Sequence, residues 1–455
     1  MEAKLQRLLQ EELENTQVPS WLHLRLLRGL RLGRRAPAPR WSHAALVAGV
    51  LLTVIAIAWL APAVRQLRGT APAERRTATT GTAMAGLPAP LQTLRMTSSS
   101  AGWGLAWFSP ADSAATYPQP FYVLKTSDGG KHWLDVSPKG AQVSEGSAAG
   151  GYFLNDKAAW VAVSQPPGAP QALVVWSTRT GGRTWSKSLV NAPPFSVEGI
   201  QVAFSGDRNG WILATSGPAA GLQRKALYRT SDGGRSWVRV ALSGLAPGLL
   251  PEEGYATGFA FLDAQRGWLG MAYRGSVPVP LYRTTDGGRT WQLQALPRPA
   301  AGPPGYGDVY PPRFFAGSQG SLPVLLSSNA GRQFALYGTD DGGDTWRLRG
   351  TTPVVEADPL AVALASADDV FIADRGRLLE SHDGGRSWSR RPYPRALGAL
   401  LDKGYAIQAF QFSTAADGWL LLAGPGAGSG AIRELLRTTD GGRSWSVEGT
   451  YRVTP

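Results

Sequence analysis

Histidine and cysteine, which often carry nucleophilic or metal chemistry, are scarce in this chain of 455 residues. The sequence has no cysteine and four histidines, which excludes disulfides, thiol catalysis and cysteine-bound metals. Beyond residue 91 only His132 and His382 occur, and each lies inside a short Gly-Gly turn motif at the edge of the expected fold. A Ser-His-Asp triad or a histidine-bound metal is therefore not expected, and neither is a cofactor.

Carboxylates remain as candidates for catalysis, because two of them can cleave a glycosidic bond as acid and base. The candidates from the long loops are Glu252, Glu253, Asp308, Glu356 and Asp358. Their spacing identifies no acid/base pair. The run Asp340-Asp341-Gly-Gly-Asp344 begins like a calcium loop but lacks the ligands that such a loop has at its end. We interpret it as a turn and expect no metal site.

The elements that must position these groups are marked by a motif that recurs seven times. Its clearest copy, Tyr282-Arg-Thr-Thr-Asp-Gly-Gly-Arg-Thr-Trp291, reads Ser/Thr, any residue, Asp, two glycines, any residue, a small polar residue and Trp. The motif aspartates are Asp128, Asp232, Asp286, Asp341, Asp383 and Asp440. The motifs end at Trp133, Trp185, Trp237, Trp291, Trp346, Trp388 and Trp445. Thr180 replaces the Asp in one copy, and His132 replaces the Ser/Thr in another.

Each motif has the chemistry of a tight turn between two strands. Two glycines supply the positive φ values that other residues resist, and the Asp and Ser/Thr side chains hydrogen-bond to the turn's own backbone. The Trp behind the turn carries a large apolar surface that one hairpin cannot bury alone. Because the unit returns about every 50 residues, the sequence predicts an array in which each repeat covers the next.

These motifs resemble the Asp boxes, or BNR repeats, of sialidases, xyloglucanases, sortilin-type receptors and the propellers related to the photosystem II assembly factor. The resemblance covers residues 91–455 and implies a β-propeller. It is greatest to the photosystem-assembly-factor group, whose members hold partner polypeptides during assembly. The Arg-Ile-Pro element that sialidases carry near the start of the propeller is missing from this sequence.

A second hairpin precedes each Asp box and completes the expected repeat. It is clearest at Gly210-Trp211, Gly267-Trp268 and Gly418-Trp419. Two hairpins give four strands, and four strands make one blade. We therefore predict an all-β, seven-bladed β-propeller of four-stranded antiparallel blades. The contiguous repeats favour a last blade built wholly from C-terminal strands, although an N-terminal strand could also complete it.

The turns and loops of such a propeller separate onto two faces. First-hairpin turns and Asp-box turns share one face, whereas the long loops between the second and third strands lie on the other, with the links between blades. Loops on a rigid scaffold are where binding residues gather. The long-loop face carries cations just ahead of the third strands: Arg224, Lys225, Arg274, Arg332, Arg375, Arg377 and Arg433. They are either solvated loop charges or a basic rim for an acidic protein partner or ligand.

The net charge of +13 is concentrated before the repeats, since residues 1–90 hold twelve Lys/Arg against five Asp/Glu. This distribution argues against a nucleic-acid partner for the propeller. Residues 1–43 are expected to form a basic amphipathic cytosolic helix, with Leu22 and Leu26 on one side and Arg25 and Arg28 on another. This segment is expected either to lie on anionic lipid or to dock a cytosolic partner. Together with the stretch 13–19, it looks like the short cytosolic segment of some anti-sigma-factor-like membrane proteins.

Residues 44–64 contain no charged residue and are long enough to cross a membrane as one helix. Ala61-Pro62-Ala63 has the spacing of a signal-peptidase site, but the long basic flank favours an uncleaved, single-pass anchor in the cell membrane. More arginines precede the span than follow it, which keeps the N-terminus cytoplasmic and the propeller extracytoplasmic. Residues 65–90, rich in Ala, Thr, Pro and Gly, are expected to be a flexible linker.

Together these features predict a membrane-anchored, extracytoplasmic propeller that serves as a non-catalytic protein-binding or assembly scaffold. One alternative is a sialidase-like propeller that hydrolyses or binds glycans, which requires two carboxylates about 5–10 Å apart in the central funnel. Another is a transmembrane sensor that signals through an anti-sigma-like stub. The oligomeric state does not follow from the sequence.

Overall fold

The chain divides into two compact units, residues 1–69 and 70–455. A computed structural model describes residues 75–77, 83–84, 87–108, 117–165, 172–272, 280–299, 306–315, 317–328, 331–355, 361–425 and 431–452. All of them belong to the second unit. The predicted cytosolic helix and membrane span, residues 1–43 and 44–64, lie outside the described residues. Among the described residues, no helix has the length and apolar character needed to cross a membrane.

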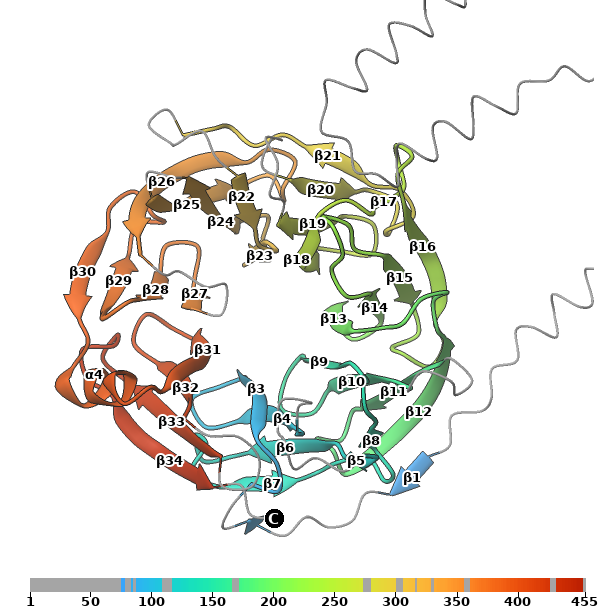
Figure 1. The fold of residues 1–455 in the computed structure, drawn as a ribbon, viewed down its shortest axis with the longest axis horizontal. Coiled ribbons are helices and arrows are strands. Elements are labelled where there is room, and N and C mark those ends of the chain that lie inside the picture. Colours follow the sequence, from blue (N-terminus) through green and yellow to red (C-terminus); the bar gives the residue numbers. More distant parts are fainter. Residues whose placement is uncertain are drawn as a thin grey trace, which may run out of the picture. The chain divides into compact units, whose positions relative to one another are not determined.

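The second unit is an all-β fold of antiparallel sheets around a common centre, consistent with a propeller (Figure 1). Its repeating element is a four-stranded meander that runs from an inner to an outer strand. The meander strands are β3 (Leu91–Met96), β4 (Gly102–Ala106), β6 (Tyr122–Thr126), β7 (Trp133–Asp135), β9 (Ala149–Phe153), β10 (Ala159–Ser164), β11 (Ala172–Thr178), β12 (Thr184–Asn191), β13 (Gly199–Ser205), β14 (Asn209–Thr215), β15 (Lys225–Thr230), β16 (Val238–Gly244), β18 (Tyr255–Phe261), β19 (Gly267–Ala272), β20 (Leu281–Thr284) and β21 (Gln292–Gln294).

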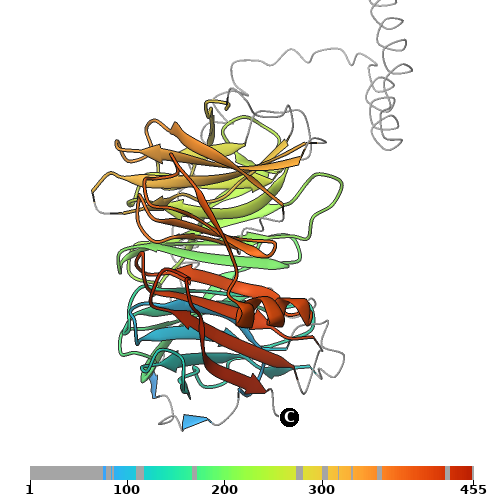
Figure 2. The same cartoon turned by 90° about the vertical axis from the view of Figure 1, so that its left-hand side faces the viewer.

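The meanders continue in the C-terminal half with the same order. Their strands are β22 (Tyr306–Val309), β23 (Arg313–Phe314), β24 (Gly320–Ser328), β25 (Gly331–Thr339), β26 (Arg347–Val354), β27 (Val362–Leu364), β28 (Val370–Asp374), β29 (Arg377–Ser381), β30 (Ser389–Pro392), β31 (Ala406–Phe412), β32 (Gly418–Ala423), β33 (Ile432–Thr438) and β34 (Ser446–Arg452). One pairing, Ala272 with Asp308, joins two meanders into a nine-stranded sheet. The described helix α4 (Arg395–Asp402) links β30 to β31 and lies toward one face in the edge-on view (Figure 2).

The Asp-box turns have the predicted chemistry. In the copy around Asp286, the Thr284 hydroxyl donates to the carboxylate at 2.8 Å and accepts from the Gly288 N–H at 3.0 Å. Asp286 also accepts from the backbone N–H of Thr290 at 3.0 Å. Gly287 and Gly288 have φ values of 78° and 97°, which only glycine adopts freely.

The two kinds of turn lie on the same face, as expected. The first glycine of an Asp box donates its N–H to a carbonyl of the preceding first-hairpin turn, as Gly287 does to Gln265 at 2.9 Å and Gly233 to Arg208 at 2.9 Å. The same pattern brings Gly441 to Ala416 at 3.0 Å. The loops between the second and third strands therefore emerge at the opposite ends of these strands.

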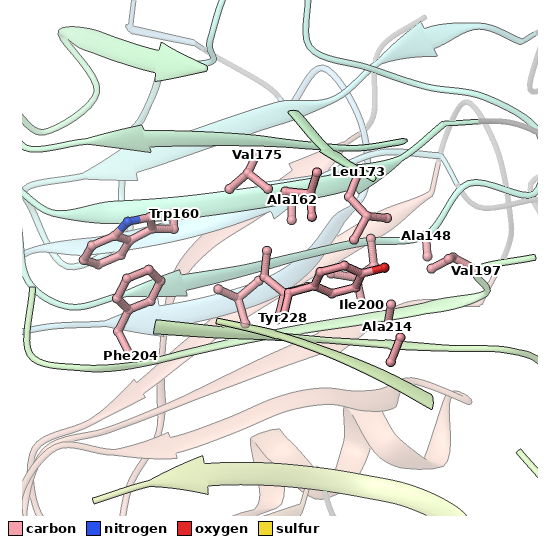
Figure 3. Close-up of a cluster of buried hydrophobic side chains, with 14 of the residues drawn as sticks. Ala148, Trp160, Ala162, Leu173, Val175, Val197, Ile200, Phe204, Ala214 and Tyr228 are labelled. Atoms are coloured by element: carbon pink, nitrogen blue, oxygen red, sulfur yellow. The ribbon is translucent and has the colours of Figure 1, made fainter. Parts of the chain in front are cut away.

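Neighbouring repeats are joined by aromatic side chains (Figure 3). Trp160 of β10 stacks on Phe204 of the next meander with ring centroids 3.7 Å apart, and its indole N–H donates to the Gly233 carbonyl at 2.9 Å. The tryptophan of the first hairpin thus binds both the inner strand and the Asp box of the following repeat. This contact satisfies the expectation that each repeat covers the next.

The motif tryptophans differ in whether they pack within their own meander or against a neighbouring one, as Trp133 does. Trp291 lies edge-on to Phe261 of its own meander, with the ring centroids 6.2 Å apart, and its indole N–H donates to the Gly288 carbonyl at 3.0 Å. Trp237 and Trp388 are half-buried. The buried motif tryptophans are Trp133, Trp185, Trp291, Trp346 and Trp445.

The last meander, β31 to β34, is built from C-terminal strands, one of the two closures open from the sequence. It contacts the first meander through side chains. The Gln411 amide accepts from the Met96 N–H at 3.0 Å and donates to the Met96 carbonyl at 2.6 Å. Gln408 donates to the Gln92 carbonyl at 3.2 Å. This seam therefore takes the form of side-chain-to-backbone hydrogen bonds between two inner strands.

Part of the predicted linker, residues 65–90, is paired with the sheets. β1 (Arg75–Thr77) pairs with β12, and β2 (Ala83–Met84) pairs with β7. Leu87 and Ala89 are buried, so the folded unit begins before Leu91. The other short strands are β5 (Gln119–Pro120), β8 (Gln142–Val143) and β17 (Leu250–Pro251).

Candidate functional site

The cations predicted for the long-loop face fall into two groups. Arg224, Arg332 and Arg375 are exposed, and Arg224 lies 3.9 Å from a Glu252 oxygen. Arg377 is paired with the buried Asp374 at 3.3 Å. These residues fit a basic rim, although two of them already have carboxylate neighbours. Arg274 lies outside the described residues.

Lys225 and Arg433 are buried rather than exposed on the rim. The Lys225 ammonium donates to the carbonyls of Gln223 at 2.8 Å, Pro251 at 2.9 Å and Gly254 at 2.9 Å. Burial lowers the pKa of Lys225 to about 7. Arg433 donates to the Leu91 carbonyl at 3.3 Å. Both cations tie backbone segments together, so neither offers its charge to a partner.

Three of the five candidate carboxylates lie within the described residues, and they do not all share the same surroundings. Glu252 and Glu253 are neighbours in sequence and line a cavity of about 360 Å³ next to Leu245 and Trp291. Asp308 is buried in β22. Glu356 and Asp358 lie outside the described residues. Within the described part of the chain, no group of three or more His, Asp or Glu side chains could hold a metal ion.

Two arginines that sequence reasoning did not select lie on inner strands near the centre of the unit. Arg95 belongs to β3 and Arg313 to β23. Both line a cavity of about 590 Å³ that also includes Tyr152, and both line a second cavity of about 410 Å³. None of the described residues that line these two cavities is Asp or Glu.

The two arginines differ in exposure, since Arg313 is half-buried and Arg95 is exposed. Burial and the nearby Arg95 charge lower the pKa of Arg313 to about 10. Burial also raises the pKa of Tyr152 despite the two arginines, so its phenol stays neutral. Arg313 donates to the Leu364 carbonyl and lies over the Phe315 ring at 5.4 Å. A carboxylate entering the cavity would relieve the repulsion and complete the hydrogen bonding of both guanidinium groups.

The position of this pair could be predicted only in part from the sequence. Arg95 is the one charged residue of the inner strand Leu91–Met96, but Gln92 and Thr93 are polar as well, so the strand gives only a weak signal for a cation near the centre. Nothing in the spacing indicates that Arg313 faces the same space. Only the arrangement of the sheets around a common centre brings the two residues together.

The comparisons with known proteins identify the repeat and a set of similar solved structures. The BNR/Asp-box repeat model matches residues 282–293, which contain the motif copy ending at Trp291. No curated protein matches the chain by sequence. Among solved structures, YCF48 bound to a D1 peptide is similar at 17% identity, covering 81% of this chain and 95% of that one, with a TM-score of 0.47.

Two further solved structures show the range of similar proteins. YCF48 from Cyanidioschyzon merolae has 18% identity, coverage of 66% and 84%, and a TM-score of 0.41. An ulvan lyase, a polysaccharide lyase, has 10% identity, coverage of 66% and 82%, and a TM-score of 0.44. The sequence motif and the sheet topology thus describe a chain that carries the BNR/Asp-box repeat in an all-β fold consistent with a propeller.

Proposed function

We propose that the chain is a seven-bladed propeller that acts as a non-catalytic scaffold, binding an acidic segment of a partner protein at its centre. The observation that carries this proposal is the pair Arg95 and Arg313, which line the same two cavities without a carboxylate among the described lining residues. A guanidinium recognises a carboxylate through paired N–H donors. A glycoside hydrolase would need two carboxylates at this place, so the geometry supports binding better than hydrolysis.

The surroundings of Arg95 and Arg313, as well as their direct contacts, would strengthen the binding of a carboxylate between them. Arg313 is half-buried although Arg95 is exposed, so water screens an ion pair with Arg313 less than an ion pair at a fully exposed surface. The exposed residues Arg224, Arg332 and Arg375 lie on the long-loop face, whereas Arg95 and Arg313 lie next to first-hairpin turns, so the rim is a separate positive surface.

Purified full-length chain is expected to bind an acidic peptide at least about tenfold more tightly than the same peptide with its Asp and Glu changed to Asn and Gln, equivalent to about 1.4 kcal/mol. The double variant Arg95→Glu/Arg313→Glu should lose this preference. Fluorescence anisotropy with a labelled peptide series measures it, and thermal unfolding confirms that each variant is folded.

The matched control is Arg332→Glu, which reverses an exposed rim charge and should change affinity less than about threefold at physiological salt. Equal loss in Arg332→Glu and in the double variant would move the site to the rim. If wild-type protein binds acidic and neutral peptides with equal affinity, the proposal is wrong.

The same proposal includes anchoring by residues 44–64, with the N-terminus cytoplasmic and the propeller outside. Its support is the uncharged stretch behind an arginine-rich flank. Since the chain has no cysteine, single cysteines report on topology cleanly. A membrane-impermeant maleimide added to spheroplasts should label Ala399→Cys, an exposed position, and should label Ser20→Cys only after lysis. Labelling of Ser20→Cys before lysis would contradict this orientation.

A further inference from the structure

A separate cavity lies beside α4, away from the arginine pair. Its volume is about 670 Å³, within the usual range for small-molecule sites. The wall combines backbone and side chains of β28, the turn after it, α4 and the start of β31. Its lining residues include Asp374, Arg375, Tyr393, Leu401, Asp402 and Tyr405.

Charge on this wall is largely balanced. Asp374 accepts from the Val355 N–H at 3.0 Å and from the Arg377 guanidinium at 3.3 Å. Arg375 and Asp402 add one charge of each sign. A balanced wall gives no strong preference to a cation or an anion, whereas it offers both donors and acceptors to a neutral polar ligand.

The aromatic and apolar part of the wall points to the same class of ligand. Tyr393 and Tyr405 provide flat surfaces, and Leu401 adds an aliphatic one. The Tyr393 hydroxyl is buried and has no hydrogen-bond partner among the described residues. Burial and the Asp374 charge raise the pKa of Tyr393, so the phenol remains a donor. An unpartnered buried hydroxyl is costly, and a ligand hydroxyl at this wall would supply the missing partner after a small ring shift.

We propose that this cavity binds a neutral carbohydrate the size of a mono- or disaccharide. Such a molecule has hydroxyls that donate to Asp402 and accept from Arg375, and it has an apolar ring face that packs on a tyrosine. The site shares no residue with the cavities that Arg95 and Arg313 line. It is therefore independent of the proposed protein-binding function.

Gly398 of α4 allows the cavity to be filled without disturbing the fold. It lines the cavity, and a Cβ added there meets nothing within 4 Å. The Cβ of Gly398→Leu therefore enters open space without a clash, and leucine is a better helix former than glycine. Ala399→Leu is the matched control, because Ala399 belongs to the same helix and is exposed.

The test is isothermal titration calorimetry of the full chain, in a detergent without a sugar headgroup, with a panel of neutral mono- and disaccharides. The panel also contains amino sugars and uronic acids. At least one neutral sugar should bind wild type and Ala399→Leu with the same affinity, and Gly398→Leu should weaken it at least about tenfold. Tyr393→Phe should weaken it as well, because the phenol donor is lost.

Three results would overturn the proposal: no neutral sugar binding to wild type, binding that Gly398→Leu leaves unchanged, or binding of charged sugars only. Acidic-peptide binding should be equal in wild type and Gly398→Leu. A loss of sugar binding and a loss of peptide binding are thus separate outcomes, so each proposal can fail without the other.

Discussion

Replacing Trp211 with alanine is expected to lower the free energy of unfolding by about 3–5 kcal/mol, the range for large aromatic truncations in a core. The indole is fully buried. It stacks on Phe261 of the next meander, with the ring centroids 3.7 Å apart and an angle of 4° between the ring planes. Its N–H donates to the Gly287 carbonyl at 3.0 Å, which the substitution leaves unpaired. One side chain thus joins two repeats in two ways.

Equilibrium urea unfolding measures this loss, and Trp237→Ala is its control. Trp237 is half-buried, and its indole N–H donates within its own turn, to Gly234 at 3.2 Å. Trp237→Ala should lower the free energy of unfolding by less than half as much as Trp211→Ala does. Equal costs would mean that burial of the motif tryptophans, and not the contact between repeats, dominates the stability of the ring.

The second large effect is expected at an Asp box. Asp383 accepts from the Ser387 N–H at 2.9 Å, from the Ser387 hydroxyl and from the Ser381 hydroxyl at 2.8 Å. Asp383→Ala removes these acceptors from an ionised group and should destabilise the protein by about 1.5–3 kcal/mol at pH 7. Thermal and urea unfolding give the difference.

This effect should depend on pH in a defined direction. The hydroxyl and N–H of Ser387 lower the pKa of Asp383 to about 2, whereas an aspartate in an unfolded chain titrates near about 3.9. The ionised carboxylate therefore stabilises the fold fully above about pH 4, and this contribution is lost as the pH falls toward 2. The stability difference between wild type and Asp383→Ala should shrink over that window.

Asp383→Thr is the matched control, because the chain itself uses Thr180 at the same position of another box. There the Thr180 hydroxyl accepts from the Thr184 N–H at 2.9 Å, so threonine preserves part of the turn. This variant should lose less stability than Asp383→Ala. The difference in stability between the two variants should not change between pH 4 and 2, because neither carries a carboxylate at position 383. A pH-independent difference for Asp383→Ala would contradict the assigned role of its charge.

The local parts of the fold were predictable because short-range chemistry decides them. Consecutive glycines, the Ser/Thr hydroxyl and the Asp carboxylate determine each turn within eight residues, and Gly210-Trp211 and Gly267-Trp268 mark the hairpin that precedes a turn. Which tryptophan contacts which repeat did not follow from the motif. Trp160 and Trp211 of the first hairpins join repeats by stacking on an inner strand of the next meander, and the motif residue Trp133 is also fully buried, in a cluster with residues of the last meander.

The candidate site was not predicted from the sequence, because the predicted binding face was the long-loop face, whereas Arg95 and Arg313 lie next to first-hairpin turns. Position ahead of a third strand does not determine burial, so Lys225 and Arg433 were placed on the rim although their charges lie among backbone carbonyls. Arg95 and Arg313 are far apart in the chain and meet only because inner strands of different meanders line one space. Such a contact depends on ring closure, which no local pattern encodes.

The most direct test of the proposed scaffold function is crosslinking of the full chain in its native cells, followed by mass-spectrometric identification of what it captures. Wild type and Arg332→Glu should capture the same exported or membrane protein, joined through an acidic segment of that protein. Arg95→Glu/Arg313→Glu, folded and present at equal amounts, should lose it. Capture that survives the double charge reversal would contradict a binding site built on these two arginines.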